Sequence, residues 1–261
     1  MERTPPDYLV VSYLALRRVI GWLGIALPVV LALGAPALRE GGLQDSISAY
    51  VHTPMRGVFV GTLSVIGVFL LSYRGYGRMD DRLGAIAGVA GVLVALFPTD
   101  DGLTNPSTAQ KVIGGLHFAF AAIFLISLAC FSLFLFTKTH AVTPEHPDLR
   151  PTRRKLARNR VYRASGGVML SALALIVITM TVPAVAGRLA GLHPVFWLEA
   201  LAVEAFGFSW LTKGEAILRD ETDAGPADRR RGVSGSGRRS PRWPRRPPRA
   251  PGPPPRRGGA R

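Results

Sequence analysis

The stretch VIGGLHFAFAAIFLISLACFSLFLF, residues 112–136, decides the fold class because it contains no charged side chain. A bilayer core of about 30 Å is crossed by about 20 apolar residues at the helical rise of about 1.5 Å per residue. Only α-helices and closed barrels satisfy their backbone hydrogen bonds in lipid, and this stretch is far too long for a barrel strand. The sequence therefore predicts a transmembrane α-helix here.

Five more apolar blocks lie on either side of this one, at residues 19–38, 58–73, 83–98, 161–185 and 194–212. A chain of 261 residues cannot bury six such blocks in a water-soluble core, so lipid is the expected solvent. The first block ends in small residues, as a cleavable signal peptide does, but it is long for one. We expect an all-α bundle of six transmembrane helices over residues 19–213, preceded by a short segment over residues 1–18.

Successive loops are alternately rich and poor in lysine and arginine. With six spans, 28 of these basic residues lie on the side that holds both termini and 4 on the other side. Cytoplasmic loops carry the excess of these residues, so the count predicts that both termini are cytoplasmic. One missed or extra helix would scramble the alternation, which therefore also supports six spans. We expect the protein in the cell inner (plasma) membrane.

Residues 214–261 form the predicted cytoplasmic tail, which is rich in Arg, Pro, Gly and Ser from about residue 225. Such a composition buries too little apolar surface to offset the entropy of ordering, so we expect disorder. The tail holds most of the net charge of +15 and would be attracted to anionic lipid headgroups. Two alternatives stay open: nucleic-acid binding, for which Trp243 is the tail's one aromatic residue, and a shifted reading frame, since Arg, Pro, Gly and Ala have GC-rich codons. No specific nucleic acid is predicted as a partner.

A second basic cluster leads into the block at 161–185 and comprises Arg153, Arg154, Lys155, Arg158 and Arg160. Cations beside a span suit the anionic headgroups of the cytoplasmic leaflet. The equally good alternative is an orientation signal that binds nothing.

Polar residues on the predicted outer side are the candidates for ligand binding: Ser46, Ser48, His52, Asp100, Asp101, His117, Glu199 and Glu204. His117 and Glu199 each lie about five residues inside a span, at matching depth, and could pair with one another. Glu204 lies deeper, near the midplane. A charge at that depth costs about 2.5–3.5 kcal/mol, so it faces the bundle interior and finds a partner. The alternative is that these groups only hydrogen-bond the helices together.

Catalytic and metal motifs are weak in this sequence. Asp100 and His117 could hold a metal ion, but their spacing matches no metal-binding motif. Ser46 or Ser48 with His117 and an Asp could form a hydrolytic triad, but no G-x-S-x-G turn supports it. The chain has no phosphate loop, so no cofactor is expected, and Cys130 is its one cysteine, which excludes an intrachain disulfide.

Several short motifs recur in an order typical of one protein family: Ser46-Ile47-Ser48-Ala49-Tyr50, Tyr73-Arg74-Gly75-Tyr76, Ala95-Leu96-Phe97-Pro98-Thr99, Arg158-Asn159-Arg160-Val161-Tyr162 and Phe208-Ser209-Trp210-Leu211-Thr212-Lys213. Over roughly residues 10–220 the chain resembles a group of bacterial multi-spanning membrane proteins that share a domain of unknown function. More distantly, its serine-rich first outer loop resembles the Frag/DRAM/Sfk group of six-span proteins, which is associated with lipid-anchor handling and autophagy. The resemblance implies a six-helix membrane protein and gives no activity.

Three function classes follow. The first is a non-enzymatic protein that binds a lipid or a small hydrophobic ligand in an outer polar pocket. The second is a membrane-embedded hydrolase or lipid-modifying enzyme that uses Asp100, Asp101 and His117. The third is a small transporter with Glu204 at the midplane, although no repeat between the two halves is evident.

Overall fold

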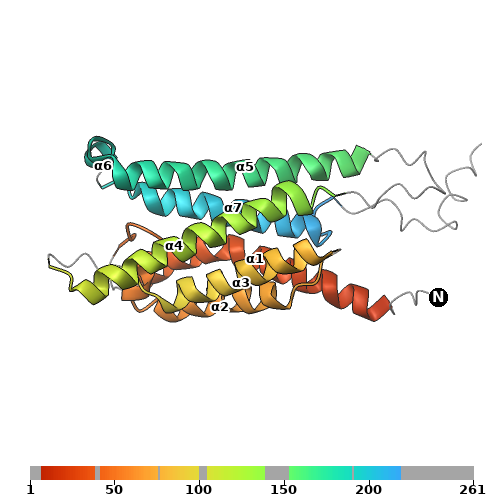
Figure 1. The fold of residues 1–261 in the computed structure, drawn as a ribbon, viewed down its shortest axis with the longest axis horizontal. Coiled ribbons are helices and arrows are strands. Elements are labelled where there is room, and N and C mark those ends of the chain that lie inside the picture. The colour runs from red at the N-terminus through yellow and green to blue at the C-terminus, as the bar shows by residue number, and fades with distance from the viewer. Residues whose placement is uncertain are drawn as a thin grey trace, which may run out of the picture. The chain divides into compact units, whose positions relative to one another are not determined.

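The computed structural model describes residues 7–38, 42–75, 77–99, 105–138, 153–189 and 191–218. Over these residues the chain is helical, with no strand (Figure 1). The α-helices are α1 (Asp7–Ala37), α2 (Arg56–Ser72), α3 (Arg78–Leu96), α4 (Thr108–Cys130), α5 (Arg153–Thr181), α6 (Pro183–Leu189) and α7 (Pro194–Lys213). A 3₁₀ turn, η1 (Ser48–His52), precedes α2, and a π-helical turn, η2 (Phe131–Leu135), continues α4. The tail from about residue 225, Asp100 and Asp101 lie outside the described residues.

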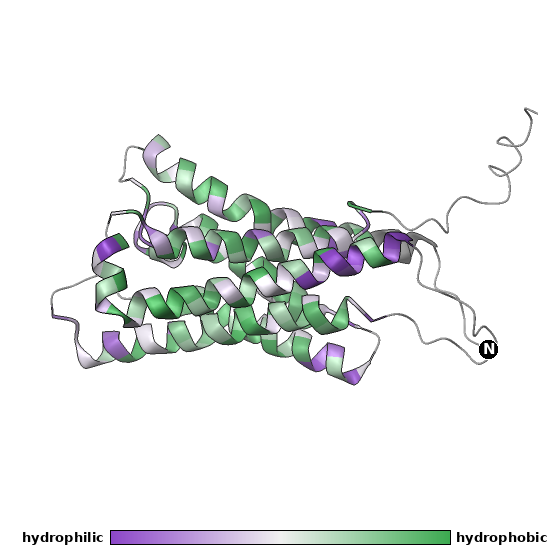
Figure 2. Ribbon diagram, turned by 90° about the horizontal axis from the view of Figure 1, so that it is seen from above, coloured by the Kyte–Doolittle hydropathy of each residue, from purple (hydrophilic) through white to green (hydrophobic). Residues whose placement is uncertain are grey.

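Four helical stretches are long and apolar enough to cross a membrane: Tyr13–Ala37 in α1, Thr108–Leu135 in α4 and η2, Arg153–Thr181 in α5, and Pro194–Lys213 in α7. The helix α2 is apolar but shorter, and α3 carries Arg78, Asp80, Asp81 and Arg82 in its first turns. Figure 2 shows apolar residues along the middle of the helices and hydrophilic residues mostly towards their ends. The all-helical fold with several membrane-compatible helices is confirmed.

The largest differences between the helices and the predicted apolar blocks occur at three places. The helix α1 begins at Asp7 rather than at residue 19, and α5 begins at Arg153 rather than at residue 161. The basic cluster before the fifth block is therefore part of a helix. At its other end α5 stops at Thr181, and Pro183 starts α6, which the sequence analysis did not predict. Proline lacks the N–H that would continue the preceding helix, and this accounts for the break.

Two helix pairs approach closely through glycine. A Cβ atom added at Gly88 of α3 would lie 2.6 Å from the carbonyl oxygen of Gly67 in α2. A Cβ atom added at Gly207 of α7 would lie 2.6 Å from the carbonyl oxygen of Gly21 in α1. Small residues permit such backbone contact in membrane bundles, where packing rather than water drives helix association.

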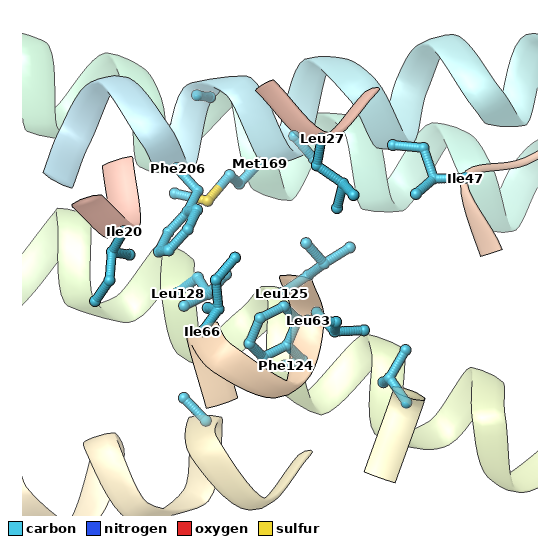
Figure 3. Packing of buried hydrophobic residues seen from close by; sticks show 14 of the residues in the cluster. Ile20, Leu27, Ile47, Leu63, Ile66, Phe124, Leu125, Leu128, Met169 and Phe206 are labelled. Atoms are coloured by element: carbon cyan, nitrogen blue, oxygen red, sulfur yellow. The ribbon is translucent and has the colours of Figure 1, made fainter. Parts of the chain in front are cut away.

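The core lies where α1, α2, α3, α4, α5 and α7 meet, and Figure 3 shows part of it. Its labelled side chains include Ile20 and Leu27 from α1, Ile66 from α2, Leu128 from α4, and Phe206 from α7. A buried hydrogen bond of 2.7 Å joins the hydroxyls of Ser132 and Ser209 and links η2 to α7.

The bundle has two ends of different composition. The Glu199 end is formed by η1, the C-terminal ends of α1, α3 and α5, and the first turns of α2, α4 and α7. The Lys213 end is formed by the opposite ends of these helices, including Arg17 of α1, Asp80 of α3 and Arg158 of α5.

Candidate functional site

The loop before α2 is attached to α7 at the Glu199 end. The backbone N–H of Phe196 donates to the carbonyl oxygen of Asp45 at 2.9 Å. The Asp45 carboxylate lies 2.8 Å from Nδ1 of His193. Ser46 accepts a 2.9 Å hydrogen bond from the N–H of Ala49, which starts the turn η1. These local bonds place the polar loop directly over the start of α7.

Glu199 is the polar centre of this end. Its Oε2 accepts a 2.6 Å hydrogen bond from the backbone N–H of Ile47, so the carboxylate binds the loop from inside the bundle. Glu199 is only half-buried, although it faces inward, because it borders two cavities. A carboxylate has about four acceptor sites, so the backbone N–H groups of Ile47 and Ser48 leave capacity for a ligand or water.

The larger cavity has a volume of about 360 Å³ and a mixed lining: Gln44, Asp45, Ser46, Ala49, His52, Thr99, Phe118, Met180, Val195 and Glu199. Ligand pockets in proteins start at about 300 Å³, so this space is large enough for a small organic group. Phe118 of α4 and Met180 of α5 are 45% and 50% exposed. Since these side chains are on the outside of the bundle, the cavity is open to the surroundings of the helices.

The smaller cavity, of about 60 Å³, has an apolar lining apart from two residues, Ser48 and Glu199. Figure 3 shows Leu27 on one side of this space and Leu63, Phe124 and Leu125 on the other. It continues the site toward the bundle core. We call the larger cavity the polar chamber and the smaller cavity the apolar chamber. Glu199 lines both of them.

Two further residues of the turn η1, Ser48 and His52, line the cavities. Nε2 of His52 lies 3.0 Å from the carbonyl oxygen of Thr99, at the end of α3. Ser48 is buried and lines the apolar chamber. Tyr50 belongs to the same turn, η1, and its side chain is buried. Burial raises the pKa of its hydroxyl, which stays neutral.

His117 does not pair with Glu199, and that prediction is wrong. Nδ1 of His117 lies 2.6 Å from the carbonyl oxygen of Phe97, and the side chain is only 1% exposed. The bond satisfies a carbonyl that α3 leaves free at its C-terminus, which is a structural role. His117 borders neither cavity. Equal depth on two helices did not bring the groups together, because depth says nothing about which way each side chain faces.

Glu204 is half-buried on α7 and borders neither cavity. The predicted metal ligand Asp100 lies outside the described residues, and the described part of the chain holds no group of three or more side chains that could ligate a metal. Of the candidate residues, the larger cavity gathers Ser46, His52 and Glu199, and the smaller gathers Ser48 and Glu199.

Seven residues that line the polar chamber were not among the candidates: Gln44, Asp45, Ala49, Thr99, Phe118, Met180 and Val195. The first two stand in the same polar loop as Ser46, so proximity in sequence was an available signal. Thr99 and Phe118 come from other elements, and no local pattern in the sequence connects them to that loop.

The predicted anionic-lipid residues separate into two groups. Arg153, Arg154 and Arg160 are exposed on α5, whereas Arg158 is buried and Lys155 is half-buried. The last two belong to the Lys213 end, at the opposite end of the bundle from Glu199.

Fold and site together define a helical protein with membrane-compatible helices and two cavities that share one half-buried carboxylate, that of Glu199. No family model, curated protein or solved structure matches this chain. The resemblance to the bacterial family stays a prediction.

Proposed function

We propose that this is an integral membrane protein with six transmembrane helices and cytoplasmic termini, which binds a lipid or other amphipathic small molecule at the Glu199 end. The four long apolar helices and the loop charge count support the topology. The helices α2 and α3, in contact through Gly67 and Gly88, complete the six. In this topology the protein lies in the cell inner (plasma) membrane, and its Glu199 end lies on the side opposite the cytoplasm.

The position of Glu199 between the two chambers carries the binding proposal. An amphipathic molecule has one apolar part and one polar part, and the two chambers offer one environment for each. Asp45 and Glu199 favour a polar head that donates hydrogen bonds or carries a positive charge. Phe118 and Met180 line the polar chamber and are exposed on the outside of the bundle, so a molecule in the bilayer can enter the chamber beside them.

Native mass spectrometry of the full chain in mild detergent tests this function. We expect a co-purifying small molecule on the wild type and its loss in Glu199→Ala. The matched control is Glu204→Ala. It removes a carboxylate from the same helix, at a position that borders neither cavity. If Glu199→Ala retains the same bound molecule as the wild type and Glu204→Ala, the proposal is wrong.

The hydrolase alternative needs His117 in the site together with Asp100 and Asp101. His117→Ala distinguishes it: we expect lower stability, since the Phe97 carbonyl loses its partner, with unchanged ligand content. Metal bound to the wild type and absent from His117→Ala would favour the enzyme instead. For the transporter alternative, no contact of Glu204 among the described residues offers support.

A further inference from the structure

The polar chamber has few side-chain donors to offer a ligand. The amide nitrogen of Gln44 donates to the carbonyl oxygen of Gly42 at 3.0 Å. Nε2 of His52 lies 3.0 Å from the carbonyl oxygen of Thr99, and because a carbonyl only accepts, Nε2 carries the hydrogen and leaves Nδ1 of the neutral ring as an acceptor. The donors that remain are uncharged: one amide hydrogen of Gln44 and the hydroxyls of Ser46 and Thr99. Among the described residues, no lysine or arginine lines the chamber.

Acceptors in the same chamber keep free capacity. Glu199 accepts from the backbone N–H groups of Ile47 and Ser48, which occupy about two of the roughly four acceptor sites of a carboxylate. The Asp45 carboxylate contacts Nδ1 of His193 through one oxygen, Oδ1. Its other oxygen has no partner among the described residues. The chamber is therefore lined by two carboxylates that no described lysine or arginine neutralises.

Charged heads of different chemistry differ in how they fit this lining. A primary ammonium brings a positive charge together with N–H donors, and both suit a carboxylate. A trimethylammonium has the charge but no donor, and proteins bind it in cages of several aromatic rings. Phe118 is the one aromatic residue among those that line the chamber. A phosphate or carboxylate head brings charge of the wrong sign and mainly acceptors, so the lining favours the ammonium.

We infer that the polar chamber binds the primary ammonium head of an amphipathic amine, with Glu199 as its main acceptor. This inference rests on the proposed binding function at the Glu199 end and names its class of ligand. Phe118 and Met180 line the chamber and are 45% and 50% exposed on the outside of the bundle, so the apolar chain of the ligand passes beside them into the bilayer. The ammonium belongs to a single-chain amine or to an ethanolamine phospholipid.

Thermal unfolding of the full chain in mild non-ionic detergent tests this class of ligand with single-chain probes of equal length: dodecylamine, dodecyltrimethylammonium, dodecanol and dodecanoic acid. A bound probe raises the Tm in a saturable way, and the concentration dependence gives its apparent affinity. We expect dodecylamine to bind about tenfold or more tightly than dodecyltrimethylammonium, because the methyl groups remove the charge-assisted hydrogen bonds. Dodecanoic acid should bind the most weakly.

Glu199→Gln tests whether Glu199 is the acceptor. The amide keeps an oxygen for the N–H of Ile47 but loses the charge. The affinity for dodecylamine should therefore fall about tenfold or more, while the affinity for dodecanol stays unchanged. The matched control is Glu204→Gln, on the same helix at a position that borders neither cavity, which should leave both affinities unchanged. If Glu199→Gln does not fold, the order of the probes on the wild type decides the question.

The outcomes separate the amine from the binding function itself. Equal affinities for dodecylamine and dodecyltrimethylammonium, tighter binding of dodecanoic acid, binding of no probe, or equal losses in Glu199→Gln and Glu204→Gln would overturn the amine. A co-purifying molecule that Glu199→Ala loses would still support the binding function in those cases. Stabilisation by phosphatidylethanolamine but not by phosphatidylcholine assigns the ammonium to a phospholipid headgroup. Stabilisation by dodecylamine without phosphatidylethanolamine assigns it to a single-chain amine.

Discussion

The two ends of the bundle are formed by the same helices but are built in opposite ways. The Glu199 end is hollow, with chambers of about 360 Å³ and 60 Å³ around a carboxylate. The Lys213 end is packed with aromatic rings around Trp210, which is fully buried. The rings in contact with Trp210 are those of Tyr73, Phe131, Phe136 and Phe206, with centroids 5.3–6.1 Å away.

The difference shows two ways to hold a charge inside a membrane-compatible bundle. Glu199 borders open space and accepts a hydrogen bond from a loop N–H, so it stays available to a ligand. Arg17 and Lys213 lie instead against rings, 4.1 Å from the Tyr13 centroid and 5.5 Å from the Phe136 centroid. Electron-rich ring faces stabilise cations and repel anions, so the aromatic end suits basic residues.

Trp210→Ala should have the largest effect, because it would create at the Lys213 end the kind of cavity that the Glu199 end already has. Removing a fully buried indole costs about 3 kcal/mol or more of unfolding free energy. Unfolding in mixed micelles measures the loss. The control is Trp197→Ala on the same helix, where the indole is 58% exposed and the loss should be much smaller. Equal losses would mean that the two ends are packed alike.

Gly207→Leu should disturb both ends together, because it separates α1 and α7, which both contribute to each end. Its Cβ would lie 2.6 Å from the Gly21 carbonyl oxygen, a distance that requires α1 and α7 to move apart. Overpacking of this kind costs about 1–3 kcal/mol. Gly61→Leu is the control, since an added Cβ there meets nothing within 4 Å. Unchanged stability and ligand content in Gly207→Leu would show that neither end depends on this contact.

Ala121→Val tests whether the apolar chamber is used. The added methyl groups would enter the cavity of about 60 Å³ that Ala121 lines, so stability should change by less than about 1 kcal/mol. Ligand content at the Glu199 end should fall. Native mass spectrometry measures the ligand content, and thermal unfolding measures the stability. An unchanged ligand content would place the bound molecule in the polar chamber alone.

Asp45→Asn should have the smallest effect on stability. The Asp45 side chain is 91% exposed, and its 2.8 Å contact with His193 is screened by solvent. Such pairs contribute between about 0 and 1 kcal/mol. The informative measurement is ligand affinity, because Asp45 lines the polar chamber and its charge favours a cationic head. If affinity for a cationic ligand does not fall, the head does not lie beside Asp45.

Much of the fold could be read from the sequence, and the site only in part. Each of the six predicted blocks lies mostly within one helix, because an apolar run of that length has few alternatives in lipid. Glu199 was identified because a carboxylate within an apolar run is costly wherever it faces. His117 was identified for the same reason, but its partner is the Phe97 carbonyl, which no side-chain pattern could reveal.

By itself, the sequence determined which segments are helices suited to lipid and which charged residues lie inside them. Both are properties of local composition, and transfer from water to lipid acts on each segment separately. Only the tertiary structure decided which charges meet, because rotation of each helix about its axis depends on contacts such as Gly21 with Gly207. That rotation turns Glu199 toward two cavities and His117 toward a carbonyl, and it gathers Arg17, Arg158 and Lys213 from three distant parts of the chain.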